Sequence, residues 1–458
     1  MTYDLVIKNG TVVTAHATFP ADVAVAGERI AALGQALSGR RELDARGQYV
    51  LPGAVDGHVH FHDPTYAPHY PPTADTFAGG SRAAALGGVT SFVDFAAPAA
   101  GLSLVEQLER RQEAADGQVV IDYALNLTLR DRAPERGLEL DAIFARGVNS
   151  IKLFMAYEGY QLDDVTLFRA MRVVARHAGL AVVHAENFDL IRELRRELAA
   201  AGQDAAEGML AACPAVMEAE AVHRAIALAQ LAGARLLLYH QTCEEGVREI
   251  RLAKARGQAV FGEACIQHLV YTNADDERMR ARGVSILTGP PIREAHHQAA
   301  LWAGLADGTL DIISTDHGPK PRQPGQVGQG STGVEARLAL AHHFGVNAGR
   351  LSLNRWVAVC CTNPAAIFGL PRKGRIEPGW DADLVVFDPR RTVTLSAQTL
   401  HSEVDFCSYD GLTVTGYPTA TLSRGEVVAQ AGQFVGEPGR GRFLARFSGP
   451  GATAPPRP

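Results

Sequence analysis

The chain has 458 residues, of which 47% are hydrophobic and 21% charged, and its formal net charge is −6. This balance is typical of a globular protein that is long enough for one large domain and a smaller one. Lysine and arginine are scattered, so the sequence offers neither a basic stripe for nucleic acid nor a polybasic membrane patch. We therefore expect small molecules and further copies of the chain as partners.

The N-terminus and the cysteines indicate a cytoplasmic protein. The first residues, MTYDLVIKNG, lack the charged and apolar regions of a signal peptide, and no run reaches the ~18 apolar residues of a membrane-spanning helix. The six cysteines show neither a CxxC pair nor zinc-finger spacing. We expect them to be reduced and mostly buried.

The predicted elements change character along the chain. Residues 1–50 form short alternating strands separated by Gly, Asn and Asp turns, and the same pattern returns after residue 376. Between residues 53 and 318, β-rich runs alternate with segments whose apolar residues recur at helical spacing. The candidate strands of this middle part are 54–61, 89–96, 119–129, 150–157, 180–186, 234–242, 259–267 and 310–318.

Strand-then-helix units in this number predict an α/β fold, a closed (β/α)8 barrel of TIM type, with a small β-sandwich formed by both chain ends. We expect a discontinuous sandwich domain from residues 1–52 and 372–445. The catalytic barrel domain would span residues 53–371. The last residues, 446–458, are rich in proline and glycine and are expected to form a flexible tail.

Polar side chains follow several predicted strands at their C-terminal ends, where chemistry is expected in a parallel barrel. In HVH, two histidines that are two residues apart on a strand face the same side and can reach one ion, such as zinc. Each residue alone has a plainer explanation, because histidines often end strands without binding metal and an aspartate can cap a helix. Taken jointly, one group at each strand end, they indicate a metal site formed by His58, His60, Lys152, His184, His240 and Asp316.

Four further histidines, His62, His69, His268 and His317, are expected to lie around the site or on the surface without binding metal.

Lys152 is the least expected member of this set, since it lies within the apolar run SIKLFMAY. A buried ammonium without a partner is too costly to keep, and an ammonium beside metal ions would be repelled. A lysine that has reacted with carbon dioxide to form a carbamate would instead present two anionic oxygens, one for each of two metal ions. We take this modification as a hypothesis.

Several motifs resemble the cyclic amidohydrolases of the amidohydrolase superfamily, which include hydantoinase, dihydropyrimidinase, allantoinase and dihydroorotase. The resemblance covers nearly the whole chain and includes LPGAVDGHVHFHDP, STDHGP and GPPIR. KLFMAY, HAEN and the ending SRGEVV…GQFVGEPGRGRF are similar to the hydantoinase–dihydropyrimidinase branch.

The resemblance implies two zinc ions per subunit, bridged by N6-carboxylated Lys152 and a hydroxide, in a homotetramer or homodimer. By position, His58 and His60 would hold one zinc together with Asp316. The other zinc would be held by His184 and His240.

The resemblance also implies roles in catalysis and substrate binding. Asp316 would move the proton from the hydroxide to the departing ring nitrogen, and Tyr157 would donate a hydrogen bond to the developing oxyanion. Where relatives usually have Ser-Pro-Pro, this chain has TGPP, so Gly289 stands in the serine's place and Thr288 precedes it. Thr332 stands where relatives have a later asparagine. These changes bear on substrate identity, because loops of this kind contact the substrate.

We expect a hydrolase that opens uncharged cyclic amides or ureides at a C–N bond, giving N-carbamoyl amino acids from hydantoins and dihydropyrimidines. His62 stands where the resemblance to dihydroorotases would require an arginine, and an imidazole is a poorer partner for a substrate carboxylate. The alternatives are an allantoinase, a specialised cyclic imide hydrolase, and a non-enzymatic dihydropyrimidinase-related scaffold. A scaffold would have no reason to keep all the metal-binding groups.

Overall fold

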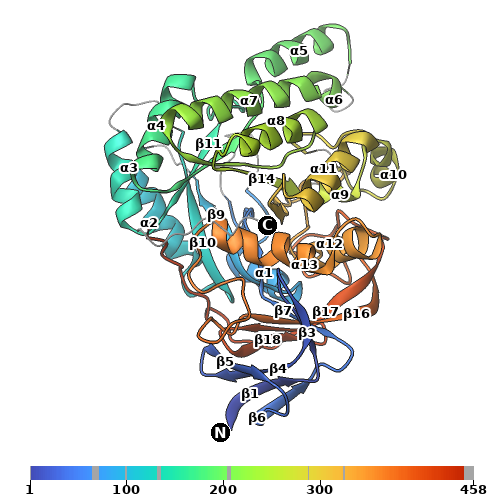
Figure 1. The fold of residues 1–458 in the computed structure, drawn as a ribbon. Helices are drawn as coiled ribbons and strands as arrows, with labels where there is room; N and C mark the ends of the chain where they lie inside the picture. The colour runs from blue at the N-terminus through green and yellow to red at the C-terminus, as the bar shows by residue number, and fades with distance from the viewer. Residues whose placement is uncertain are drawn as a thin grey trace.

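The computed structural model describes residues 2–63, 72–97, 101–130, 136–203, 208–286, 288–322 and 325–447. A barrel of parallel strands surrounded by helices forms one part of the molecule, and β-sheets built from the two chain ends lie beside it (Figure 1). The predicted α/β fold, a (β/α)8 barrel with a β-sandwich from both chain ends, is confirmed.

The eight barrel strands run in chain order, and each pairs in parallel with the next. Each lies within the run predicted for it. The strands are β8 (Ala54–Asp56), β9 (Val89–Ala96), β10 (Asp122–Thr128), β11 (Ser150–Phe154), β12 (Leu180–His184), β13 (Arg235–Leu238), β14 (Val260–Cys265) and β15 (Ile312–Ser314). Just beyond the first and last strands, Val59 bridges His317 and the His60 N–H donates to the His317 carbonyl at 2.7 Å. The C-terminal ends of β8 and β15 are therefore neighbours.

Helices alternate with these strands, and their ends follow local sequence signals. Ser103 and Glu106 form a reciprocal capping box at the start of α2, and Asp163 caps α4. Helix α7 ends at Gly233, whose positive φ of 68° suits a residue without a Cβ. The longer helices are α1 (Phe77–Leu86), α2 (Leu104–Ala115), α3 (Arg136–Ala145), α4 (Asp164–Arg176), α5 (Phe188–Ala200), α7 (Ala215–Ala232), α8 (Glu244–Ala255) and α11 (Ala295–Asp307).

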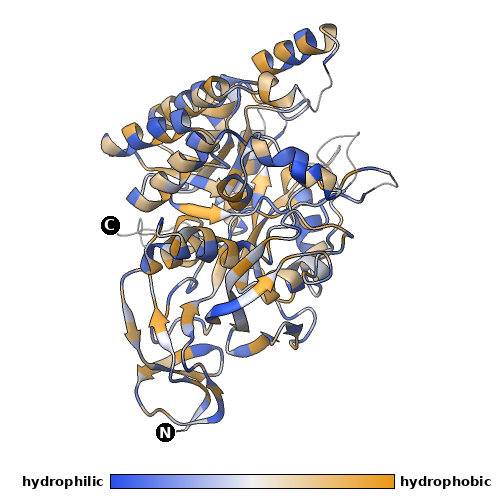
Figure 2. Ribbon diagram, turned by 90° about the vertical axis from the view of Figure 1, so that its right-hand side faces the viewer, coloured by the Kyte–Doolittle hydropathy of each residue, from blue (hydrophilic) through white to orange (hydrophobic). Residues whose placement is uncertain are grey.

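The shorter helical elements follow the strands of the second half of the barrel. They are α6 (Met209–Ala212), α9 (Ile266–Val270), η1 (Asn273–Asp275), α10 (Asp276–Ala281), α12 (Arg337–Ala341), η2 (His342–Asn347), α13 (Leu353–Val357), η3 (Ala358–Thr362) and α14 (Asn363–Ile367). In Figure 2 the outer helices carry both hydrophilic and hydrophobic residues, as amphipathic helices that pack on a barrel do. Among the described residues, no helix is both long and apolar enough to cross a membrane.

Two sheets next to the barrel are built from strands of the N-terminal and C-terminal parts of the chain. One has the strand order β5-β4-β1-β6, and the other the order β19-β18-β17-β16-β7-β2-β3. In the second sheet β16 pairs antiparallel with β7, which joins the N-terminal to the C-terminal part of the chain. The strands are β1 (Tyr3–Lys8), β2 (Thr11–Val13), β3 (Thr18–Pro20), β4 (Asp22–Ala26), β5 (Arg29–Gly34), β6 (Gly39–Asp44), β7 (Tyr49–Pro52), β16 (Leu384–Thr394), β17 (Thr413–Ser423), β18 (Glu426–Gln430) and β19 (Gln433–Phe434).

After β19 the chain returns to the barrel. Residues 441–446, which we call the C-terminal arm, run beside the start of β10: the Tyr123 N–H donates to the Arg442 carbonyl at 3.0 Å, and the Leu444 N–H to the Tyr123 carbonyl at 2.7 Å. The Arg446 N–H donates to the Gly147 carbonyl at 2.7 Å. Most of the segment predicted as a flexible tail, residues 448–458, lies outside the described residues.

Candidate metal centre and active site

Three predicted metal ligands meet where the barrel closes. His58 and His60 follow β8, and Asp316 follows β15, so the neighbouring strand ends bring them together. The Asp316 Oδ1 atom lies 3.2 Å from His58 Nε2 and 3.1 Å from His60 Nε2. Both histidines are buried. Two imidazole nitrogens and a carboxylate oxygen this close together could hold one divalent cation.

The two other predicted histidines form a second pair. His184 ends β12 and His240 follows β13, and their rings turn towards each other, with Nδ1 of His184 2.9 Å from Nε2 of His240. Burial lowers the pKa of His184 and lowers that of His240 further. Both rings are therefore neutral near pH 7, which is the form of histidine that binds metal. This pair could hold a second cation.

Lys152 lies in β11, within the barrel and 1% exposed. Its Nζ atom is 4.2 Å from the centroid of the Tyr239 ring and 4.8 Å from that of Phe154. Burial lowers the pKa of Lys152 to about 7, although the negative charge of Asp316 opposes this shift. In about half of the molecules Lys152 is then a neutral amine at pH 7, and the neutral amine is the form that can add carbon dioxide.

A buried carboxylate that sequence reasoning missed supports both histidine pairs. Glu263 lies in β14 and is fully buried. Its Oε2 atom is 3.0 Å from His58 Nδ1 and accepts the backbone N–H of His240 at 2.8 Å. Because a carboxylate can only accept, His58 carries its hydrogen on Nδ1 and keeps Nε2 free for a ligand. Glu263 interrupts the apolar run AVFGEAC as Lys152 interrupts its own, and this signal could have identified it.

Two further carboxylates, also missed, orient the other histidines. Asp63 lies 3.1 Å from His60 Nδ1, and Glu186 lies 2.7 Å from His184 Nε2. Burial alone would lower the pKa of His60, but hydrogen bonds to Asp316 and Asp63 raise it to about 9. Because Asp63 and Glu186 each hold one ring nitrogen, Nε2 of His60 is turned towards Asp316 and Nδ1 of His184 towards His240.

The donor set fits a pair of borderline divalent cations such as zinc. His58, His60 and Asp316 form one group of donors and His184 and His240 another, and the ring centroids of His58 and His240 lie 5.7 Å apart. Burial alone would raise the pKa of Asp316, but the neighbouring His58 and His60 hold it well below its usual value. Mixed nitrogen and oxygen ligands of this kind suit zinc better than magnesium or calcium. The structure thus brings together the six residues that the sequence singled out for metal binding.

Tyr157 and Gly289, two of the predicted substrate residues, contact each other. The Tyr157 hydroxyl donates to the Gly289 carbonyl at 3.0 Å, and its ring lies 4.7 Å from the His184 ring. A Cβ atom at position 289 would lie 2.5 Å from the Tyr157 oxygen, so the contact depends on glycine. Burial raises the pKa of Tyr157 well above its usual value, which keeps the phenol protonated and able to donate.

The other two predicted substrate residues are engaged by the protein. The Thr288 hydroxyl donates to the Pro290 carbonyl at 2.7 Å. The Thr332 N–H donates to the Ser408 hydroxyl at 3.1 Å, and the Thr332 hydroxyl accepts the Ser408 N–H at 2.9 Å. Ser408 therefore occupies the N–H of Thr332 and one acceptor position of its hydroxyl.

The remaining histidines differ in burial. His62 is exposed, and His69 lies outside the described residues. His317 is buried with its Nε2 atom 2.6 Å from Asp75. His268 lies 3.2 Å from the Thr288 hydroxyl, and burial lowers its pKa to about 4, so it supports this loop as a neutral ring.

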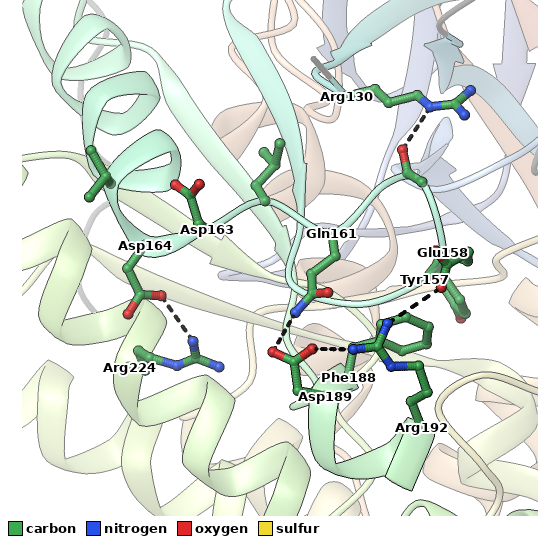
Figure 3. A pocket seen from close by; sticks show the side chains of 13 residues that line it. Arg130, Tyr157, Glu158, Gln161, Asp163, Asp164, Phe188, Asp189, Arg192 and Arg224 are labelled. Carbon is green, nitrogen blue, oxygen red and sulfur yellow. Dashed lines mark hydrogen bonds and ion pairs between the residues drawn. The ribbon is translucent and has the colours of Figure 1, made fainter. Parts of the chain in front are cut away.

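A cavity of about 800 Å³ opens beside Tyr157, between the loop that follows β11 and helices α4, α5 and α7 (Figure 3). Charged side chains on its wall pair with one another: Arg192 donates to Asp189 at 3.1 Å, and Arg224 to Asp164 at 2.9 Å. Its lining residues include Tyr157 but none of the six candidate metal ligands. The cavity therefore flanks the metal residues and meets the candidate site at Tyr157.

Comparison with known proteins agrees with this geometry. A model of the amidohydrolase family matches residues 49–428, a range that contains all six candidate metal ligands. The chain belongs to the amidohydrolase family. The amidohydrolase is 40% identical to a D-hydantoinase from Streptomyces coelicolor, over 96% of this chain and 97% of that protein.

Solved structures extend the likeness. The structure of dihydropyrimidinase from Brevibacillus agri has a TM-score of 0.92 and 37% identity, covering 97% of this chain and 98% of its own. An L-hydantoinase from Arthrobacter aurescens has a TM-score of 0.89 and 32% identity, covering 97% of this chain and 100% of its own. The predicted resemblance to hydantoinase-type enzymes is confirmed, and this amidohydrolase is a metal-dependent enzyme that hydrolyses cyclic amides.

Proposed function

We propose that this amidohydrolase opens the rings of hydantoins and dihydropyrimidines at a C–N bond and releases N-carbamoyl amino acids. The observation that carries the proposal is that the two groups of candidate metal ligands lie at one end of the barrel together with Lys152 and Tyr157. One group is His58, His60 and Asp316, and the other is His184 and His240. The D-hydantoinase and dihydropyrimidinase relatives, similar over nearly the whole chain, support the same reaction.

We assign two zinc ions to this centre, one with His58, His60 and Asp316 and one with His184 and His240. Carboxylated Lys152 would supply a ligand to each ion. When bound, a metal pair supplies an acidified water and polarises the scissile carbonyl. The donor chemistry and the lowered pKa of Lys152 support this assignment.

Asp316 would serve as the proton carrier. Because its pKa lies well below the usual value, it is a carboxylate at neutral pH and can accept a proton. It would then pass that proton to the ring nitrogen as the C–N bond breaks, so that this nitrogen leaves as the neutral NH2 of the carbamoyl group instead of as an anion. General acid–base catalysis of this kind contributes roughly 10²–10⁴-fold in rate.

Tyr157 would stabilise the negative charge that develops on the carbonyl oxygen. Its hydroxyl has a proton to donate, and this hydroxyl donates to the Gly289 carbonyl at 3.0 Å. Substrate binding would move the hydroxyl from that carbonyl to the oxyanion, while the Gly289 carbonyl becomes free to accept a ring N–H.

The substrate would be uncharged. Position 62, where a dihydroorotase would need an arginine, is an exposed histidine. The buried guanidinium nearby, Arg111, is already engaged by the His62 carbonyl at 2.9 Å and by Asp94 at 2.5 Å. Neither His62 nor Arg111 therefore offers a substrate carboxylate a fixed bidentate partner.

A substrate panel tests the proposal. The value of kcat/KM should be measured for hydantoin, 5-substituted hydantoins, dihydrouracil, succinimide, allantoin and dihydroorotate. We expect hydantoins or dihydrouracil to be preferred, and dihydroorotate to react little. A clear preference for allantoin or dihydroorotate would refute the assignment, and no ring opening of any member by the metal-loaded protein would support a scaffold.

We also propose a homotetramer or homodimer in the cytoplasm. Leu190 on α5 and Val216 and Leu231 on α7 are 47%, 59% and 73% exposed, which supports contact between copies. All six cysteines are buried and unpaired, as a reducing compartment allows. We keep the division into a sandwich domain (1–52 and 372–445) and a barrel domain (53–371), which the pairing of β7 with β16 supports.

A further inference from the structure

A column of polar side chains fills the barrel interior on the far side of the metal residues. It begins at Arg446 on the C-terminal arm and continues through Ser150 on β11 and Asn126 on β10 to Tyr239, which follows β13. Ser150 and Lys152 are two residues apart on one strand, so both face the interior. Each side chain of the column is at most 2% exposed.

Hydrogen bonds connect the column without interruption. Arg446 Nη1 donates to the Ser150 hydroxyl at 3.0 Å, and that hydroxyl donates to Asn126 Oδ1. Asn126 Nδ2 donates to the Tyr239 oxygen at 2.9 Å, and the Tyr239 hydroxyl donates to the Gly57 carbonyl at 2.7 Å. Gly57 immediately precedes His58.

The far end of the column touches both kinds of metal ligand. The Tyr239 ring stacks on the His58 ring, with centroids 3.9 Å apart and planes 19° apart. Lys152 Nζ lies 4.2 Å from the centroid of the same Tyr239 ring. The position of Tyr239 therefore limits where the His58 ring and the Lys152 side chain can lie.

The burial of Arg446 needs a reason. Its acceptors are the Ser150 hydroxyl and the carbonyls of Leu125 and Phe368, which are all neutral. A guanidinium desolvated against neutral groups costs free energy, and an apolar side chain could fill the same space without that cost. What an apolar side chain could not do is hold the Ser150 hydroxyl and, through it, the Asn126 amide in one orientation.

We propose that Arg446 is a positioning residue for the metal centre: through Ser150 and Asn126 it fixes Tyr239, and Tyr239 fixes His58 and Lys152. The C-terminal arm would then help to orient the metal ligands, although it lies at the opposite end of the barrel. This inference rests on the proposed metal centre.

Metal release tests the column from both ends. The zinc-loaded protein is mixed with excess chromogenic chelator, and the rate of zinc release is measured for the wild type, Arg446→Ala and Tyr239→Phe. Because residues behind metal ligands typically change affinity by about 10–100-fold, each variant should release zinc at least about 10-fold faster. The matched control is Arg442→Ala on the same arm, whose side chain pairs with Glu28 and should release zinc within about twofold of wild type.

The double variant separates a connected column from two independent defects. If Arg446 acts through Tyr239, the double variant should release zinc no faster than the faster single variant, whereas multiplied effects would refute the connection. Cobalt-substituted Tyr239→Phe and Arg446→Ala should both show an altered visible spectrum, and millimolar guanidinium should partly restore zinc retention in Arg446→Ala. Unchanged spectra and release rates within twofold of wild type would overturn the proposal.

Three further outcomes have defined consequences. If Arg446→Ala does not fold, Arg446→Lys and Tyr239→Phe carry the same comparison, since Tyr239→Phe removes a single oxygen. A wild type that binds two metal ions but opens no cyclic amide leaves this inference intact and refutes the proposed substrate class. A wild type that binds no metal refutes both.

Discussion

Glu263→Gln is the change that most sharply separates a metal-supporting carboxylate from an ordinary buried one. The native carboxylate accepts from His58 Nδ1 at 3.0 Å and from the His240 N–H at 2.8 Å with the same oxygen. Glutamine keeps the shape but has one accepting oxygen and one donating NH2 group. If the glutamine oxygen takes the place of Oε2, it keeps both contacts only as a neutral acceptor, and the NH2 group takes the place of Oε1, which is buried without a hydrogen-bond partner among the described residues.

The expected size follows from these contacts. A hydrogen bond to a charged group contributes about 1.5–3 kcal/mol, and about 1.4 kcal/mol corresponds to a factor of ten. Replacing this charged acceptor by a neutral one weakens its bonds to both His58 and His240, which predicts metal binding weaker by about 10–100-fold. The assay is competition between the protein and a chelator of known affinity, read as bound metal per chain, with the melting temperature recorded alongside.

Glu335→Gln is the matched control, because Glu335 is also buried and also holds a histidine by its ring and a backbone N–H. Its oxygens lie 2.9 Å from Nδ1 and 2.7 Å from the backbone nitrogen of His401, which is not one of the candidate metal ligands. We expect this control to keep metal affinity within about twofold. Equal losses in the two variants, or an unchanged affinity in Glu263→Gln, would refute the reasoning.

The remaining predictions concern the reacting groups. Lys152→Ala should lose metal and activity together and regain part of both with a short carboxylic acid. Because the pKa of Lys152 is about 7, zinc reconstitution of the wild-type apoprotein should depend on bicarbonate and be about tenfold faster at pH 8 than at pH 6. Bicarbonate dependence retained in Lys152→Ala would contradict this. Asp316→Asn should lower turnover by about 10²–10⁴-fold, with metal content measured in parallel, and near-normal turnover with both metals bound would place the proton carrier elsewhere. Gly289→Ala should push the Tyr157 hydroxyl away and lower kcat more than it raises KM; the same loss in a Tyr157→Phe background would show that the effect does not pass through Tyr157.

The barrel and its metal residues were predictable because both depend on local pattern. Parallel strands buried on both faces give apolar runs such as VTSFVDFA in β9, all of which is buried. The strand ends gather at one end of the barrel, so a histidine or aspartate just after each run could be placed without knowing any contact.

The supporting residues were not predictable in the same way. Asp63 and Glu186 look like ordinary loop residues until their histidine partners are known, since such a contact depends on the side-chain orientation of both. The hydroxyl of Thr332 is engaged by Ser408, 76 residues further along the chain, which no local pattern reveals. Arg446 precedes a Pro- and Gly-rich stretch, so composition gave no sign that its side chain lies inside the barrel.

Titration of the metal-free protein with zinc, in the presence of bicarbonate, tests the central claim most directly. Ring opening of hydantoin or dihydrouracil should be absent without metal, rise with added zinc and reach its plateau at about two zinc ions per chain. Activity in the metal-free protein, or a plateau at one zinc per chain, would contradict a reaction that depends on a metal pair held by Lys152 and the two histidine pairs.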